Sequence, residues 1–199
     1  MKMALLEASD PEQPIVEAVR QGDRKAFEEL MRRHNGWIRG VVYGVLGERD
    51  GLDDVVQQVW TAVWRRIAEL RDAGRWRPWV YRLSRNAALD AGRDATRRRR
   101  RNAALPGEPP TSASTTPDAE LVGSEQHREV LNAIQELPVL YREPFVLRHL
   151  QGWSYRQIAE VMDMPVDSVE TRLVRARRML RESLKEKLGL GNGTSSETR

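Results

Sequence analysis

A proline-rich stretch near the middle of the chain constrains the fold most. Residues 102–124 contain four prolines and no apolar periodicity, a composition typical of a linker. The flanking segments have the spacing of amphipathic helices and no strand-like alternation, and 199 residues leave room for two small domains. We therefore predict an all-α protein with two small helical domains, at 12–101 and 125–188, joined by a flexible linker and followed by a disordered tail at 189–199.

The supply of reactive side chains argues against an enzyme. The sequence has no cysteine, which excludes disulfides, thiol nucleophiles and cysteine-based zinc sites. His34, His127 and His149 are scattered without ligand spacing. Asp53 and Asp54 are adjacent, but neighbouring helical residues point about 100° apart, so they make a poor metal pair. We predict no catalysis, no cofactor and no metal.

The first residues of the chain bear on its location. Residues 1–14 are acidic and lack the long apolar segment of a secretory signal. No apolar stretch approaches the roughly 20 residues that cross a bilayer. We therefore expect a cytoplasmic protein without membrane insertion.

Positive charge is concentrated in one segment. The whole chain has a formal net charge of only +4, yet residues 71–101 contain eleven arginines against three acids. A solvated face usually mixes its signs, so a run of one sign indicates contact with nucleic acid.

The apolar spacing predicts four helices in the first half and three to four shorter helices in the second. In the first half we expect one helix at 12–21, a long second helix that begins after the N-cap Asp23, a third at 52–70, and a fourth with Pro78 near its first turn. In the second half we expect them at 125–136, 140–150, 154–162 and 167–187. The predicted core line of the third helix is Leu52, Val56, Val59, Val63, Ile67 and Leu70, and that of the fourth is Val80, Leu83, Ala87 and Ala91.

Residues 154–178 have the plan of a helix-turn-helix. Ser154 can cap a short helix, a tight turn follows at 163–165, and the next helix has an apolar and a polar face. The inward residues are Ile158, Ala159, Met162, Val169, Leu173, Ala176 and Leu180, and the outward residues are Asp167, Thr171, Val174, Arg175 and Arg178. Such a polar face fits the major groove, and the alternative is an ordinary helical hairpin with a solvated face.

The fourth helix combines arginine with aromatic residues. Arg82, Arg85, Asn86 and Arg93 gather on the side away from its predicted core line, and Trp76, Trp79 and Tyr81 cluster at its start. Guanidinium groups hold phosphates and flat rings stack on exposed bases, which suits opened DNA. The alternative is that the tryptophans belong to the core, which we expect for Trp79 and leave open for Trp76.

The start of the third helix suits a protein interface. Asp53 and Asp54 are explained in part by the helix dipole, which favours acids at the N-terminus. Gln57, Trp60 and Trp64, however, lie along the edge of the core stripe, where aromatic and polar groups together are typical of an interface.

These motifs resemble those of the extracytoplasmic-function sigma factors of the sigma-70 family, group IV. Leu52-Asp-Asp-Val-Val-Gln-Gln-Val-Trp60 and Trp76-Arg-Pro-Trp-Val-Tyr-Arg-Leu-Ser-Arg-Asn-Ala-Ala-Leu-Asp90 resemble their region 2. Leu137-Pro138, Gly152-Trp-Ser-Tyr-Arg-Gln-Ile-Ala159 and Val169-Glu-Thr-Arg-Leu-Val-Arg-Ala-Arg-Arg-Met-Leu180 resemble their region 4. The resemblance covers nearly all of residues 23–184, with the motifs in the family's order.

The resemblance implies an RNA polymerase sigma factor that directs core polymerase to promoters and assists DNA opening. It implies contact with the β′ clamp helices and the β flap of core polymerase, with promoter DNA and, in many members, with an anti-sigma factor. The implied core contacts are Asp53, Asp54, Gln57, Gln58, Trp60 and Trp64. The loop at 71–75 and the helix from Trp76 are implied to read and melt the minus-ten element, and the implied minus-ten residues are Arg75, Trp76, Tyr81, Arg82, Arg85, Asn86 and Arg93. The implied minus-thirty-five residues are Tyr155, Arg156, Asp167, Ser168, Glu170, Thr171, Arg172, Arg175 and Arg178.

Two positions depart from the family pattern. Glu170 stands where the family often has Lys or Arg, and a carboxylate there repels phosphate but can accept a hydrogen bond from cytosine N4. Asp163 stands in the turn where the family prefers Gly; Asp tolerates the left-handed conformation at some cost.

Other functions explain fewer of these features. A helix-turn-helix regulator acting without polymerase leaves residues 53–64 and the arginine-aromatic helix without a role. A recombinase or nuclease needs an activated nucleophile or clustered carboxylates, and a structural adaptor does not predict the arginine-rich segment. A linker of about 22 residues stretches to about 70 Å, so the domains can reach two promoter elements or fold against each other.

Overall fold

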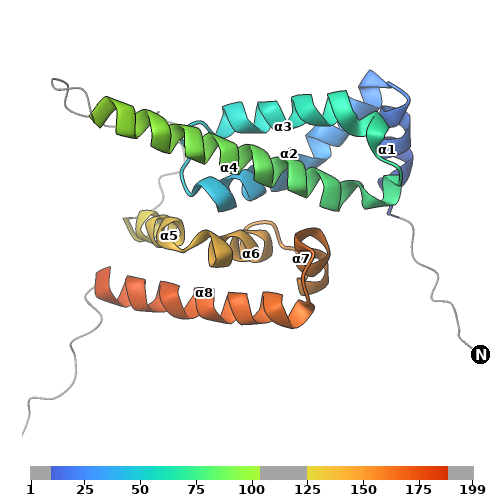
Figure 1. The fold of residues 1–199 in the computed structure, drawn as a ribbon. Helices are drawn as coiled ribbons and strands as arrows, with labels where there is room; N and C mark the ends of the chain where they lie inside the picture. The colour runs from blue at the N-terminus through green and yellow to red at the C-terminus, as the bar shows by residue number, and fades with distance from the viewer. Residues whose placement is uncertain (1–9, 104–124, 188–199) are drawn as a thin grey trace, which may run out of the picture.

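The computed structural model describes residues 10–103 and 125–187, and these ranges are helical with no strand. The predicted tail and almost all of the predicted linker lie outside the described residues. Two helical bodies are seen, one above the other (Figure 1). The all-α fold class expected from the sequence is therefore confirmed. No helix in the described ranges has the length and apolar character needed to span a bilayer.

The first body consists of α1 (Gln13–Arg20), α2 (Arg24–Leu46), α3 (Leu52–Arg66) and α4 (Trp76–Ala103). Two short 3₁₀ helices, Ile67–Glu69 and Ala73–Arg75, connect α3 to α4. As predicted, Asp23 caps α2, because its carboxylate accepts hydrogen bonds from the backbone N–H groups of Lys25 and Ala26. Gly47 ends α2 at a φ of 76°, which a glycine adopts without strain.

The second body consists of α5 (Glu125–Glu136), α6 (Val139–His149), α7 (Tyr155–Met162) and α8 (Val166–Lys187). Ser154 caps α7 in a capping box with Gln157. Each boundary lies within a few residues of the sequence prediction, because the caps and turn residues that end these helices are local signals.

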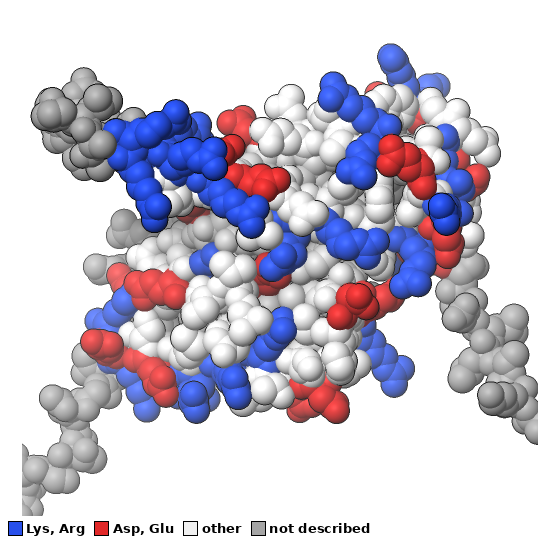
Figure 2. Space-filling view, viewed as in Figure 1, with Lys and Arg blue, Asp and Glu red and all other residues white. Residues whose placement is uncertain are grey.

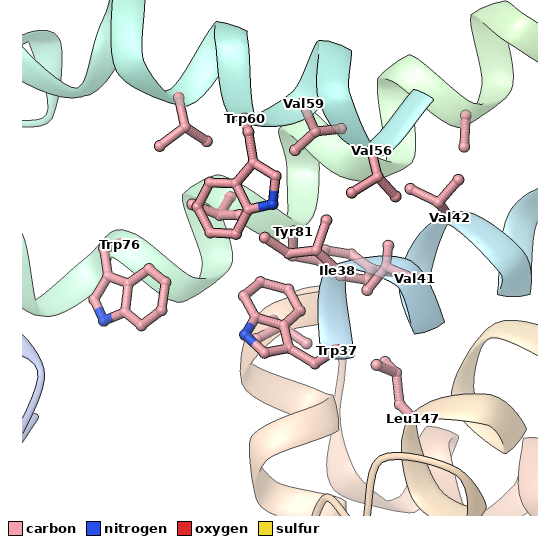
Figure 3. Packing of buried hydrophobic residues seen from close by; sticks show 14 of the residues in the cluster. Trp37, Ile38, Val41, Val42, Val56, Val59, Trp60, Trp76, Tyr81 and Leu147 are labelled. Atoms are coloured by element: carbon pink, nitrogen blue, oxygen red, sulfur yellow. The ribbon is translucent and has the colours of Figure 1, made fainter. Parts of the chain in front are cut away.

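The core confirms most of the predicted apolar faces. All six residues of the line predicted on α3 are buried, and so are Val169, Leu173, Ala176 and Leu180 on α8. Figure 3 shows Val56 and Val59 of α3 packed with Ile38, Val41 and Val42 of α2. On α7, Ile158 and Ala159 are buried as predicted, but Val161 is buried in place of Met162, which is half-buried.

The predicted core line of α4 is wrong in part. Val80 is fully buried, whereas Leu83, Ala87 and Ala91 are half-buried. The most deeply covered neighbours are instead Ser84, Ala88 and Tyr81. The prediction assumed that only one face of α4 is covered. The helix instead packs against α2 and α3 of its own body and also against α7 of the second body.

The two bodies share a core. α6 packs along α2, and α7 packs against α4. Leu147 of α6 joins the same apolar cluster as Trp37 and Val41 of α2 (Figure 3). Close approach is possible because Gly44 has no side chain: a Cβ there would lie 3.3 Å from the Cα of Glu143. The domains are thus folded against each other, one of the two arrangements that the linker length allows.

Candidate nucleic-acid interface

The segment 154–178 folds as the predicted helix-turn-helix. α7 and α8 pack through Ile158, Ala159, Val169 and Leu173, all buried. Asp163 occupies the turn with φ 52° and ψ 56°. This is the left-handed conformation expected at that position, and it lets α8 leave the turn across α7.

The polar face of α8 is largely open. Its exposed members are Asp167, Glu170, Thr171, Val174, Arg175 and Arg178, while Ser168 and Arg172 are half-buried. On α7, Arg156 is exposed and Tyr155 is half-buried beneath Arg148, whose guanidinium carbon lies 5.3 Å from the Tyr155 ring centre. The structure therefore brings together on one surface most of the residues predicted to read the minus-thirty-five element.

The face of α4 predicted to bind opened DNA is only partly open. Arg75, Arg82, Asn86 and Arg93 are exposed, and Arg85 is half-buried. Trp76 and Tyr81, the aromatic members of the set, are 0% and 3% exposed. In this conformation neither ring can stack on a base.

Trp76 belongs to the core of the first body. Its Nε1 donates a hydrogen bond to Oδ2 of Asp10 at 2.9 Å, and its ring packs at 4.7 Å on His34 and at 6.2 Å on Trp37. Burial lowers the pKa of His34, against the opposing influence of Glu12. Of the two interpretations left open for Trp76, the geometry matches the core residue. Asp10 was missed because nothing local in the sequence links it to Trp76.

Tyr81 and Arg85 are held by an acid from the second body. The Tyr81 hydroxyl donates to Oε2 of Glu143 at 2.9 Å, and Nε of Arg85 donates to Oε1 of the same carboxylate at 3.0 Å. Glu143, on α6, is 4% exposed. Burial and the nearby Glu143 charge raise the pKa of Tyr81 above its usual range. The second body therefore covers the side of the predicted DNA-binding face of α4 that contains Tyr81 and Arg85, and leaves Arg82, Asn86 and Arg93 open.

Arg142, next to Glu143, extends in the other direction. Its Nε and NH2 donate to the backbone carbonyls of Gly44 and Val45, each at 2.8 Å, and its NH1 donates to the carbonyl of Gln135. These acceptors include carbonyls of the last turn of α2, which have no partner within the helix. Arg142 is 5% exposed, and burial lowers its pKa. The pair Arg142 and Glu143 thus ties α6 to both α2 and α4.

The predicted protein interface on α3 surrounds a shallow apolar hollow. Asp53, Asp54, Gln57 and Gln58 are exposed. Trp60 is buried, with Nε1 donating to Oδ1 of Asn35 at 3.0 Å. A hollow of about 440 Å³ lies beside them, lined by Phe27, Met31, Asn35, Arg39, Asp53, Val56, Gln57, Trp60, Thr61 and Trp64. An apolar floor with a polar rim is typical of a protein-binding surface. Phe27 and Met31 were missed as contributors, since their spacing indicated only a core role.

Positive charge is densest at the end of α4. Figure 2 shows a dense group of arginines at the far end of α4, where residues 97–101 are all exposed. Within residues 10–103 and 125–187, no group of three or more His, Asp or Glu side chains is placed to hold a metal ion.

Comparison with known proteins finds relatives for both bodies. Residues 30–98 match the family model for sigma-70 region 2, and residues 127–180 match that for sigma-70 region 4. The chain is 33% identical over 181 residues to the ECF RNA polymerase sigma-E factor of Haemophilus influenzae, covering 87% of this chain and 95% of the relative. It is 30% identical over 186 residues to the sigma-E factor of Escherichia coli K12, covering 85% and 92%.

Two solved structures share the arrangement of helices. CnrH in complex with the cytosolic domain of CnrY has a TM-score of 0.65 at 25% identity, covering 89% of this chain and 99% of CnrH. The sigma factor RpoE of Bartonella quintana, in complex with the anti-sigma factor NepR, has a TM-score of 0.61 at 20% identity, covering 81% and 98%. The second likeness supports the fold alone.

Proposed function

The chain belongs to the family of extracytoplasmic-function sigma factors. From that premise we propose which residues bind core polymerase and which bind promoter DNA during transcription initiation. It is an RNA polymerase sigma factor with a region 2 body and a region 4 body.

Region 4 reads the minus-thirty-five element through α8. The supporting observation is the exposed polar face of that helix, presented by a short turn at Asp163. Arg175 and Arg178 are placed to contact base edges or phosphates, and Thr171 and Glu170 are placed to contact bases. Tyr155 and Arg156, at the start of α7, are placed to contact the DNA backbone.

Region 2 binds core polymerase through α3 and the minus-ten element through α4. The hollow beside Gln57 and Trp64 accepts an apolar side chain of the clamp helices. Asp53 and Gln57 border it, and Asp54 and Gln58 are exposed on the adjoining side of α3. On α4, Arg82, Asn86 and Arg93 face solvent and are ready to hold phosphates. We assign Trp76 a structural role, because its ring is enclosed by His34 and Trp37.

Minus-ten binding requires the two bodies to separate. Tyr81 and Arg85 cannot reach DNA while Glu143 holds them. The described structure is therefore a closed form, and binding to core polymerase supplies the free energy that opens it, because a ligand shifts an equilibrium toward the state that it binds more tightly. The observation that carries this proposal is the pair of hydrogen bonds by which Glu143 holds Tyr81 and Arg85 on α4.

The remaining assignments follow from the family. We propose that the protein performs no catalysis of its own, needs no cofactor, and acts in the cytoplasm, where its polymerase is. CnrH is solved with the cytosolic domain of CnrY, and we propose that this chain too is regulated by an anti-sigma factor.

Opening can be tested by energy transfer between two dyes. Because the sequence has no cysteine, two cysteines introduced by substitution would be the only sites that a thiol-reactive dye labels. Glu28→Cys on α2 and Glu182→Cys on α8 lie on exposed positions of the two bodies. With a donor and an acceptor dye attached, energy transfer should be high in the free protein and should fall when core polymerase is added. Unchanged energy transfer in a sample that has bound polymerase would contradict the proposed opening.

A further inference from the structure

Two methionines border the contact between the bodies. Met162 and Met164 stand on either side of the turn that follows α7, are half-buried, and pack against the apolar cluster that the two bodies share. Both line a cleft of about 340 Å³. The same cleft is lined by Tyr81, Arg85 and Glu143, whose hydrogen bonds hold the bodies together. The two thioethers therefore lie beside the contact that must break before the bodies separate.

The position of these two sulfur atoms distinguishes them from the others in the chain. The sequence has no cysteine, so a switch based on a thiol is excluded. The other two methionines among the described residues lie elsewhere. Met31 lines the hollow beside α3, and Met179 packs against a second apolar cluster whose buried members all belong to region 4. An oxidant that reaches Met162 and Met164 therefore acts where the two bodies meet.

We propose that peroxides oxidise Met162 and Met164 and that the resulting sulfoxides open the closed form. The inference rests on the opening proposed above. In the reaction the thioether sulfur attacks one oxygen of hydrogen peroxide, and an S–O bond forms as the O–O bond breaks. The other oxygen takes the proton and leaves as water, so the sulfur loses two electrons and the peroxide is reduced.

Oxidation changes the chemistry that the cleft has to accommodate. A thioether is apolar and only a weak hydrogen-bond acceptor, whereas a sulfoxide is polar and disrupts apolar packing. A sulfoxide oxygen without a donor in this half-buried site costs free energy. Arg85, a donor in the cleft, already donates to Glu143, so a sulfoxide that takes this donor weakens the contact between the bodies. In the open form water hydrates the sulfoxide, and the equilibrium therefore shifts toward that form.

Opening has a consequence for promoter binding. It releases Tyr81 and Arg85, which are proposed to bind the minus-ten element. A peroxide therefore raises the fraction of the chain that is ready to bind DNA. Methionine sulfoxide reductases, one for each epimer of the sulfoxide, reverse the change.

The test measures the radius of gyration of the free full chain by small-angle X-ray scattering, before and after treatment with hydrogen peroxide. Peptide mass spectrometry quantifies oxidation at each methionine. Met162→Leu/Met164→Leu removes both thioethers at nearly constant volume, and this variant should stay compact in peroxide. Met179→Leu removes a methionine away from the cleft and should respond as wild-type does. Met162→Gln/Met164→Gln places uncharged polar groups in the cleft and should be expanded without any oxidant.

The radius of gyration of wild-type should increase once both methionines are oxidised, and it should fall again after incubation with the two reductases. We expect the ratio of open to closed chain to rise about fivefold, because a polar group without a partner costs ~1 kcal/mol or more in a partly buried site. An unchanged or smaller radius with both sulfoxides present would overturn the proposal, and so would equal expansion of Met162→Leu/Met164→Leu.

Circular dichroism distinguishes opening from unfolding. The oxidised chain should keep the helical content of the untreated chain, and a loss of helix that accompanies the expansion would also overturn the proposal. None of these measurements depends on transcription. A wild-type chain that stays compact until it is oxidised but directs no promoter-specific transcripts would contradict the proposed function and not this inference.

Discussion

Nε of Arg85, on α4, lies 3.0 Å from Oε1 of Glu143, on α6 of the other body. The same carboxylate accepts a hydrogen bond from the Tyr81 hydroxyl. A buried acid of region 4 thus occupies two residues proposed to bind DNA in region 2. For this reason we propose that the closed form and the promoter-bound form are mutually exclusive.

Replacing the acid should favour the open form. Glu143→Gln keeps the shape and leaves an amide oxygen for Tyr81, but it removes the charge that holds Arg85. Because Arg85 is 40% exposed, we expect a loss of only ~1 kcal/mol, about a fivefold shift toward the open form. Free Glu143→Gln protein should bind single-stranded minus-ten DNA more tightly than wild-type by about that factor, measured by fluorescence anisotropy.

The matched control for this substitution is Glu136→Gln. Glu136 is an exposed acid whose partners, Lys187 and Ser183, lie in its own body, so this change should leave the affinity at the wild-type value. The assignment of Glu143 is wrong if both variants, or neither, bind the oligonucleotide more tightly.

Core binding should depend on the exposed polar side chains of α3. Asp54→Ala/Gln57→Ala removes two exposed side chains that make no described hydrogen bond through their side chains, so circular dichroism should show an unchanged fold. Affinity for core polymerase, measured by surface plasmon resonance, should fall about fivefold or more, since each polar contact that is lost contributes ~0.5–1 kcal/mol. Glu28→Ala/Gln21→Ala, an exposed acid and amide elsewhere, should bind normally; a double variant of α3 with wild-type affinity would exclude this surface.

Arg175 should contribute to promoter reading. It is exposed on α8, and its contact with the Tyr141 hydroxyl is long, at 3.5 Å, so DNA can replace it. Arg175→Ala should weaken binding to duplex minus-thirty-five DNA by ~1–3 kcal/mol and relax base preference at one position. Arg181→Ala, on another side of the same helix, should do neither. Unchanged affinity and preference in Arg175→Ala would remove this residue from the interface.

The turn of the helix-turn-helix should show backbone strain. Asp163 has a φ of 52°, which costs an ordinary residue ~1–2 kcal/mol and glycine almost nothing. Asp163→Ala should therefore lower the free energy of unfolding by about 1 kcal/mol in urea titration, since alanine lacks the local hydrogen bonding of aspartate. Asp163→Gly should be as stable as wild-type or more so. The reverse order would mean that the Asp163 carboxylate makes an interaction of its own.

His34 should make stability depend on pH. Burial lowers its pKa from 6.5 in the folded state, so the unfolded chain takes up a proton first as the pH falls. Its contribution is complete above about pH 6.5 and is lost below it. The melting temperature of wild-type should therefore fall more than that of His34→Asn between pH 7.5 and pH 5.5. If the difference in melting temperature between wild-type and His34→Asn did not change with pH, the pKa of His34 would be the same in the folded and unfolded states.

The features that could be predicted from the sequence are those that depend on residues close together in the chain. Asp23 and Ser154 cap helices through groups two or three residues away, and the buried line from Val169 to Leu180 follows from helical periodicity alone. The open face of α8 is the other side of that line, so its residues were also predictable.

The contacts between the bodies could not be predicted in this way. Glu143 meets residues about sixty positions earlier, and Arg142 meets carbonyls about one hundred positions earlier, across a segment with no periodic signal. Because α4 is covered from two sides, its exposed face is narrower than predicted. Trp76 and Tyr81, which were predicted to bind DNA, are therefore buried.

The most direct test of the account is run-off transcription by purified core polymerase with the full chain on a pool of promoter fragments. We expect the chain to bind core polymerase and transcripts to arise only from fragments that share one pair of elements, with no added metal or nucleotide beyond what the polymerase uses. A chain that binds duplex DNA but neither binds core polymerase nor directs transcripts would contradict it, and would be a helix-turn-helix regulator instead.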